Sequence, residues 1–125
     1  MPDTETDPKT RTPSERITEE VSSWPGVEAG IGRRGEFGFT VGRREIGHLH
    51  GDHAAHFGFP KALWAELHEQ GRIAHHPVFP DKEGPGARAI ETEDDVRDVI
   101  ALMRLNYDRV IASHEPPEGD SPKAA

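Results

Sequence analysis

The chain has 125 residues, among them 15 Lys or Arg, 23 Asp or Glu and no Cys, and its formal net charge is −8. This length allows one small domain, and the lack of cysteine excludes disulfides, thiolate nucleophiles and cysteine-bound metals. The acidic balance argues against nucleic acid and anionic membrane surfaces as partners, because both carry negative charge themselves.

The two ends of the chain are predicted to be disordered tails, over residues 1–13 and 114–125. They carry few apolar side chains that could offset the entropy lost on ordering. Residues 14–113 then form a single domain. The first residues lack the basic and apolar regions of a signal peptide, and no apolar stretch approaches the ~20 residues that cross a bilayer. We therefore expect a cytoplasmic protein.

The N-terminal half of this domain is predicted to form a helix and an antiparallel meander. Ile17, Val21 and Trp24 recur at helical spacing before a Pro-Gly stop, which indicates a helix over about 14–23. Apolar residues then alternate with polar residues or glycine, as in half-buried strands. Three such strands are expected at 27–31, 37–41 and 45–50. The segment 51–59, rich in Gly and Ala, is predicted to be a loop.

The C-terminal half is predicted to contain two helices and two short strands. A proline in the first turn and a glycine after the last turn delimit a helix over Pro60–Gln70. Short strands are expected at 72–76 and 87–90. From Val96 to Val110, apolar residues recur every three or four positions, which indicates the clearest helix of the chain. The order α-β-β-β-α-β-β-α predicts an α+β domain with helices on one face of a mostly antiparallel sheet of about five strands.

The residues best suited to catalysis or metal binding lie in the segment 45–56, Glu-Ile-Gly-His-Leu-His-Gly-Asp-His-Ala-Ala-His. Side chains alternate along a strand, so Ile46, His48 and His50 are expected on one face and Glu45 on the other. Two imidazoles about 6.6 Å apart along a strand can converge on a common small target.

Three interpretations of these histidines remain open. The first is that they are ordinary strand and loop residues that bind nothing. The second is a divalent metal site, in which His48 and His50 are completed by His75, its neighbour His76 or Asp52. The third is a metal-free acid/base pocket, in which His48 or His50 takes a proton and Asp52 orients the imidazole.

The stretch Gly42–Asp52 resembles the luciferase domain of bioluminescent fungi, which small bacterial proteins also carry. The specific part of the resemblance is Glu-Ile-Gly-His-Leu-His-Gly at 45–51. Further matching features are Phe59-Pro60, which opens a helix, and Arg104-Leu105-Asn106-Tyr107 in the closing helix. The resemblance covers roughly residues 24–111.

This resemblance implies an enzyme that oxidises a hydroxylated α-pyrone with molecular oxygen and releases carbon dioxide and light, without an organic cofactor. It implies His48, His50 and Asp52 as catalytic residues, with Glu45 beside them. The chemistry is consistent, because an enol needs a base to become an electron-rich enolate that can pass an electron to oxygen, and histidine is a suitable base near neutral pH.

The substrate site of such an oxygenase is expected to be apolar, which keeps water away from a peroxide intermediate. Ile46, Phe57, Phe59 and Trp64 are the candidate lining residues, and Arg44 is the candidate for holding substrate oxygens. The sequence therefore predicts an oxygenase of an enolisable small molecule. A metalloprotein and a non-catalytic small-molecule-binding module are the alternatives.

Overall fold

The computed structural model describes residues 11–32 and 35–114. The elements are α1 (Pro13–Ser22), β1 (Val27–Ile31), β2 (Phe37–Val41), β3 (Arg44–His50), β4 (Ala54–Gly58), α2 (Lys61–Glu69), β5 (Ala74–His75), β6 (Pro85–Ala89) and α3 (Glu93–His114). The predicted tails lie largely outside the described residues, although Pro13 begins α1 and His114 ends α3.

The predicted α+β class is confirmed, with one more strand than expected. Within the described residues the strands form one antiparallel sheet in the order β1-β2-β3-β4-β6-β5. The additional strand is β4, which replaces part of the predicted loop. Ala55, His56 and Phe57 of β4 are all buried, because β4 is an inner strand that pairs with β3 on one side and β6 on the other.

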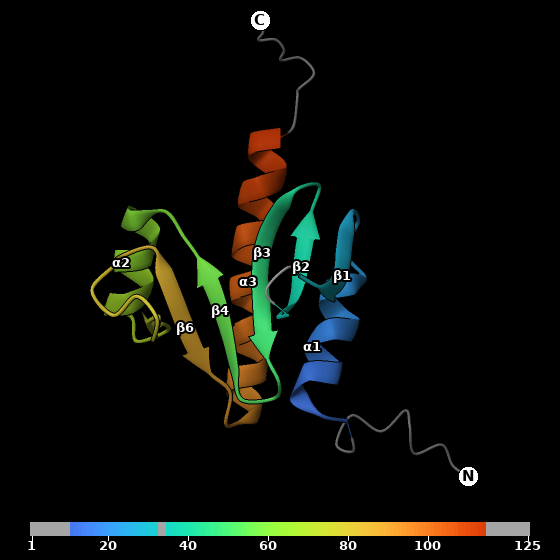
Figure 1. Ribbon diagram of the computed structural model, residues 1–125, viewed down its shortest axis with the longest axis horizontal. Coiled ribbons are helices and arrows are strands. Elements are labelled where there is room, and N and C mark those ends of the chain that lie inside the picture. Colours follow the sequence, from blue (N-terminus) through green and yellow to red (C-terminus); the bar gives the residue numbers. More distant parts are fainter. Residues whose placement is uncertain (1–10, 33–34, 115–125) are drawn as a thin grey trace, which may run out of the picture.

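The helices cover one face of the sheet, as predicted. Figure 1 shows α3 crossing behind the centre of the sheet, while α1 and α2 lie toward its two ends. The helix α3 contacts β2, β3 and β6, and α1 contacts α3 and β1. On α2, Trp64 donates its indole N–H to the carbonyl of Pro85 on β6, at 2.9 Å. The opposite face of the central strands has no covering helix in the described part of the chain, and we call it the open face.

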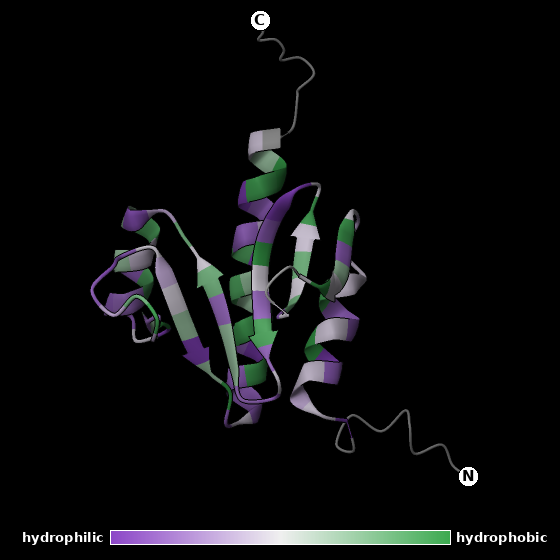
Figure 2. Ribbon diagram, in the orientation of Figure 1, coloured by the Kyte–Doolittle hydropathy of each residue, from purple (hydrophilic) through white to green (hydrophobic). Residues whose placement is uncertain are grey.

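The hydrophobic core lies between the sheet and α3. Figure 2 shows apolar and polar residues alternating along α3, and the apolar residues Val99, Leu102 and Met103 are fully buried. On the sheet side they meet Phe39 and Ile46, which are also fully buried. In residues 11–32 and 35–114, no helix combines the length and the apolarity that crossing a bilayer requires.

Gly47 has no side chain, and this lets α3 approach β3 closely. A Cβ atom placed on Gly47 would lie 2.6 Å from the Met103 sulfur and 3.0 Å from Cδ1 of Phe57. These separations are shorter than van der Waals contact, so any side chain at this position would force Met103 and Phe57 to move. Gly47 therefore faces the helices and belongs to the core.

The first helix begins at Pro13, one residue before the predicted start, and a capping box precedes it. The hydroxyl of Thr12 accepts the N–H of Glu15, and the carboxylate of Glu15 accepts the N–H of Thr12. This reciprocal pair satisfies two donors that the first helical turn leaves unpaired.

A β-bulge in β3 corrects the predicted arrangement of side chains on that strand. Phe39 pairs with Gly47 and Thr40 pairs with Glu45, so Ile46 has no partner in the ladder. One extra residue reverses the alternation of faces on one side of the bulge. Ile46 is consequently buried in the core, and Glu45 lies on the open face. The prediction that Ile46 shares a face with His48, with Glu45 opposite, is wrong.

Candidate functional site

Four histidines gather on the open face, and we call them the imidazole cluster: His48, His50, His56 and His76. His48 and His50 come from β3, His56 from β4, and His76 directly follows β5. Strand pairing places His56 opposite His48. The ring centroids of His50 and His76 each lie 4.1 Å from that of His56, and His48 lies 5.3 Å from it.

Sequence reasoning missed His56 and named His76 only as one of three alternatives to complete a metal site. His56 was assigned to a loop, although the alternation of Ala55, Phe57 and Phe59 with polar residues or glycine would have indicated a strand. His76 reaches the cluster because β5 pairs with β6 at the sheet edge, a contact that spacing along the chain does not reveal.

His75, the residue suggested to complete a metal site, lies away from the cluster. Its ring centroid is 4.8 Å from that of Trp64 and 5.2 Å from that of His68. Both of these partners belong to α2, on the helix-covered side. Adjacent residues along extended backbone point to opposite faces, so of the two neighbouring histidines it is His76, the other alternative, that lies in the cluster.

His48 is oriented by Glu45, a contact made possible by the bulge. Nδ1 of His48 lies 2.7 Å from Oε2 of Glu45. An ionised carboxylate can only accept hydrogen bonds, so Nδ1 of His48 is the donor. In the neutral imidazole, Nε2 then carries the lone pair and is available to take a proton or a metal ion. The His48 side chain is 14% exposed and that of Glu45 is 49% exposed.

His56 is the most buried member of the cluster, at 6% exposure. Its Nδ1 atom is buried and has no hydrogen-bond partner among residues 11–32 and 35–114. Burial, together with the neighbouring His50 and His76, lowers the pKa of His56 to about 4. His56 is therefore a neutral imidazole at neutral pH. An unsatisfied buried polar atom costs about 1–3 kcal/mol and calls for an explanation.

His76 completes a group of three imidazoles with convergent nitrogens. One ring nitrogen from each of His48, His56 and His76 lies within 4.8 Å of the other two. Nδ1 of His76 also accepts the backbone N–H of Val78, at 3.1 Å. These imidazoles can accept a proton from a bound molecule or coordinate a metal ion.

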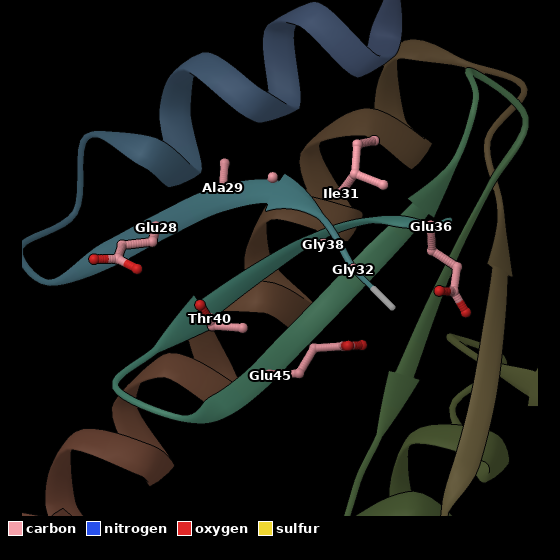
Figure 3. Close-up of a pocket in the computed structure, with 9 residues that line it drawn as sticks. Glu28, Ala29, Ile31, Gly32, Glu36, Gly38, Thr40 and Glu45 are labelled. Carbon is pink, nitrogen blue, oxygen red and sulfur yellow. The ribbon is translucent and has the colours of Figure 1, made fainter. Parts of the chain in front are cut away.

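A hollow of about 670 Å³ adjoins the cluster on the open face. Its lining residues are Glu28, Ala29, Gly30, Ile31, Gly32, Glu36, Gly38, Thr40 and Glu45. Figure 3 shows the side chains of Glu36 and Glu45 in this hollow, with α3 behind the sheet. Gly38 pairs with His48 and Glu45 is bonded to it, so the hollow and the cluster are continuous.

The residues expected to form an apolar substrate lining lie elsewhere. Ile46, Phe57, Phe59 and Trp64 are all buried in the hydrophobic core. The hollow beside the imidazoles has instead a mixed lining, with three carboxylates and a glycine-rich wall. The reason is that the helices cover the apolar face of each strand, and the bulge moves Ile46 onto that face.

Asp52 and Arg44 occupy positions at opposite ends of β3. Asp52, in the turn after β3, accepts the backbone N–H of Ser14 at 2.9 Å, and this hydrogen bond lowers the pKa of Asp52. Arg44 begins β3. Burial lowers the pKa of Arg109 on α3, and the nearby charge of Arg44 lowers it further. Glu45 supplies the carboxylate contact to His48 that the sequence analysis assigned to Asp52.

Comparison with known proteins gives one match. The family model described as Luciferase domain matches residues 43–106, slightly more than half of the chain. Comparisons with curated proteins and with solved structures found no match. The matched segment extends from β3 into α3 and includes all four histidines of the imidazole cluster. The chain therefore belongs to the Luciferase domain family.

Proposed function

We propose that this luciferase-type domain is an oxygenase that acts on an enolisable, hydroxylated small molecule without an organic cofactor, with His48 as the proton acceptor. The observation that carries the proposal is the hydrogen bond of 2.7 Å between Nδ1 of His48 and Glu45. It directs the lone pair to Nε2, and the carboxylate stabilises the imidazolium that forms when Nε2 takes a proton.

The proposed reaction uses one substrate molecule and one oxygen molecule. Nε2 of His48 accepts the proton of the enol hydroxyl, which leaves the electron pair on the substrate as an enolate. The enolate passes one electron to oxygen, and the two radicals combine to form a carbon–oxygen bond. The imidazolium then returns its proton to the peroxide. The product is a substrate hydroperoxide, and no electron is needed from another source.

The hollow supports a substrate that arrives neutral and rich in hydroxyl groups. Glu28, Glu36 and Glu45 line it, and carboxylates accept hydrogen bonds from hydroxyl donors. The same carboxylates repel a substrate that is already an anion. A molecule that becomes an enolate only by passing its proton to His48 satisfies both conditions.

Oxygen consumption tests this proposal. Protein without a histidine tag is stripped of metal with a chelator, and oxygen uptake is measured with a panel of hydroxypyrones and catechols. We expect uptake by the unmodified chain and a loss in kcat/KM of about 10²–10⁴-fold in His48→Gln, the range for a general base. We expect a smaller loss in Glu45→Gln, of about 10–100-fold, because this residue acts through His48.

His53→Gln is the matched control, because His53 is an exposed histidine outside the cluster. It should keep the activity of the unmodified chain. The proposal is overturned if no member of the panel supports oxygen uptake, or if His48→Gln and His53→Gln behave alike. Binding of a panel member without oxygen uptake would instead identify a non-catalytic binding module.

A further inference from the structure

We propose that His48, His56 and His76 form a binding site for a divalent transition metal ion. This inference goes beyond the proposed function, which requires no metal. It differs from the metal site expected from the sequence, because His56 takes the place given to His50, and His76 is the third ligand instead of His75 or Asp52.

The first support is the convergence of three nitrogens from three different segments. The ligand atoms of His48, His56 and His76 lie within 4.8 Å of one another. Metal–imidazole bonds are about 2.0–2.1 Å long, so nitrogens around a tetrahedral ion are roughly 3.3 Å apart. Each pair would therefore approach by at most about 1.5 Å, which side-chain rotation can supply.

The second, independent support is the unpartnered nitrogen of His56. This side chain is more than nine-tenths buried, yet its Nδ1 atom has no hydrogen-bond partner in the described part of the chain. A metal ion coordinated by Nδ1 would give this buried atom the partner that the described protein atoms do not provide.

The surroundings of the other two ligands suit metal binding as well. Glu45 accepts from Nδ1 of His48, and this carboxylate–histidine arrangement orients the ring and raises its basicity toward a metal at Nε2. Glu36 and Glu45 in the adjoining hollow also attract a cation.

The donor set identifies the class of metal. Imidazole nitrogens favour zinc, copper, nickel, cobalt and iron, whereas magnesium and calcium prefer oxygen ligands. Three protein ligands leave a fourth position for water or for a ligand oxygen. His50 is exposed and its ring lies 5.2 Å from that of His48, so this position faces the open side of the sheet.

Metal binding at His76 would break the hydrogen bond that the Val78 N–H donates, and nonspecific binding of cations would not. This N–H donates to Nδ1 of His76, so Nδ1 is unprotonated in the neutral ring. If the metal binds Nδ1, it displaces the N–H of Val78. If it binds Nε2, the proton moves to Nδ1, which then cannot accept. In either case the Val78 hydrogen bond is lost.

The test uses the full chain without a histidine tag, stripped of metal and titrated separately with Zn²⁺ and Co²⁺ at neutral pH. Calorimetry measures the affinity and stoichiometry, and the visible absorbance of Co²⁺ reports coordination. We expect one ion per chain. Because each ligand supplies one of three bonds, His48→Gln and His76→Gln should each weaken binding at least ~100-fold, and Glu45→Gln should weaken it about 10–100-fold.

Three further measurements make the result decisive. His53→Gln should bind as the unmodified chain does, since it preserves the number of clustered histidines. The amide of Val78 should shift in the NMR spectrum and exchange faster when Zn²⁺ is added. His56→Ala should also abolish binding, but this buried position can affect folding, so His76→Gln at the sheet edge is the primary variant.

The proposal is overturned if no stoichiometric binding occurs, if His76→Gln binds as tightly as the unmodified chain, or if His53→Gln weakens binding to the same extent. Its failure is distinguishable from failure of the proposed oxygenase function. Metal binding is measured without substrate, and oxygen uptake is measured without metal. Nε2 of His48 can hold either a proton or a metal ion. Zn²⁺ added to the metal-stripped protein should therefore inhibit its oxygen uptake.

Discussion

Asn106 on α3 donates its side-chain amide to the carbonyl of Ile46, the bulged residue of β3, at 3.2 Å. The same amide nitrogen donates to the carbonyl of Gly58 at the end of β4, at 2.9 Å. Asn106 is 1% exposed. This one buried side chain thus satisfies a backbone group that the bulge leaves unpaired and joins the two strands that carry His48 and His56.

Replacing Asn106 with Leu should destabilise the protein by about 1–3 kcal/mol, because two carbonyls lose their buried donor. It should also loosen the bulge and with it the contact between Glu45 and His48. Urea denaturation measures the first effect, and NMR of the His48 ring measures the second. Ser113→Ala, an exposed polar-to-apolar change on the same helix, should stay within about 0.5 kcal/mol. Equal effects of the two variants would contradict this role.

Gly47→Ala should destabilise the fold by about 1–3 kcal/mol through overpacking. The added methyl would lie 2.6 Å from the sulfur of Met103, and a backbone shift that relieves the clash would separate β3 from α3. Gly30→Ala is the matched control in the same sheet, because its Cβ would meet nothing within 4 Å. Thermal unfolding of both variants checks the expectation, and a Gly47→Ala protein as stable as Gly30→Ala would refute it.

The contact between Asp52 and Ser14 should make stability depend on acid pH. The pKa of Asp52 is lowered in the folded state by the N–H of Ser14. The stabilisation of the fold by the ionised Asp52 carboxylate is therefore complete above the unfolded pKa of 3.8. It is lost as the pH falls through the lower pKa of the folded state. Asp52→Asn should be less stable than the unmodified chain at pH 6, and this difference should shrink toward pH 2. Urea midpoints across that range measure it, and a difference that grew in acid would have the wrong sign.

Asp98 should contribute more to stability than Asp108, although both residues lie on α3 and both pair with arginine. Asp98 accepts from Arg72 at 2.7 Å and lies 3.1 Å from Arg88, in a partly buried network that joins α3 to the β5–β6 edge. Asp108 makes an exposed pair with Arg104. Asp98→Ala should lower the free energy of unfolding by about 1–3 kcal/mol, because Arg72 and Arg88 each lose a carboxylate partner.

Asp108→Ala should cost less than about 0.5 kcal/mol. Hydrogen exchange adds a local readout, since Asp98→Ala should increase exchange in β5, the strand that leads to His76. Similar stability and exchange in the two variants would show that the network does not hold this edge.

The elements with strong local patterns could be predicted from the sequence. Apolar residues at helical spacing identified α3, and strict alternation identified β1 and β2. The strand β4 was missed because Gly and Ala around His56 suggested a loop. Its identity as a strand depends on pairing with β3 on one side and β6 on the other. The N-cap of α1 was missed although Thr12 and Glu15 have the spacing of a capping box.

The site was less predictable than the fold. His48 and His50 could be placed on one side of a strand, because alternation of side chains is a local property of extended backbone. The residues assigned to an apolar lining were not placed correctly, since the pattern does not say which face the helices will cover. The bulge at Ile46 carries no signal that this one sequence reveals, and it decided which carboxylate reaches His48.

By itself, the sequence determined that this is a small acidic α+β domain of the luciferase type, with two histidines displayed together on one strand. Only the tertiary structure decided that Glu45, His56 and His76 join them and that His75 and Asp52 do not. The physical reason is that strand register, a bulge and the pairing of a sheet edge arise from contacts between residues far apart in the chain. Local periodicity constrains which way a side chain points, and packing determines what it meets there.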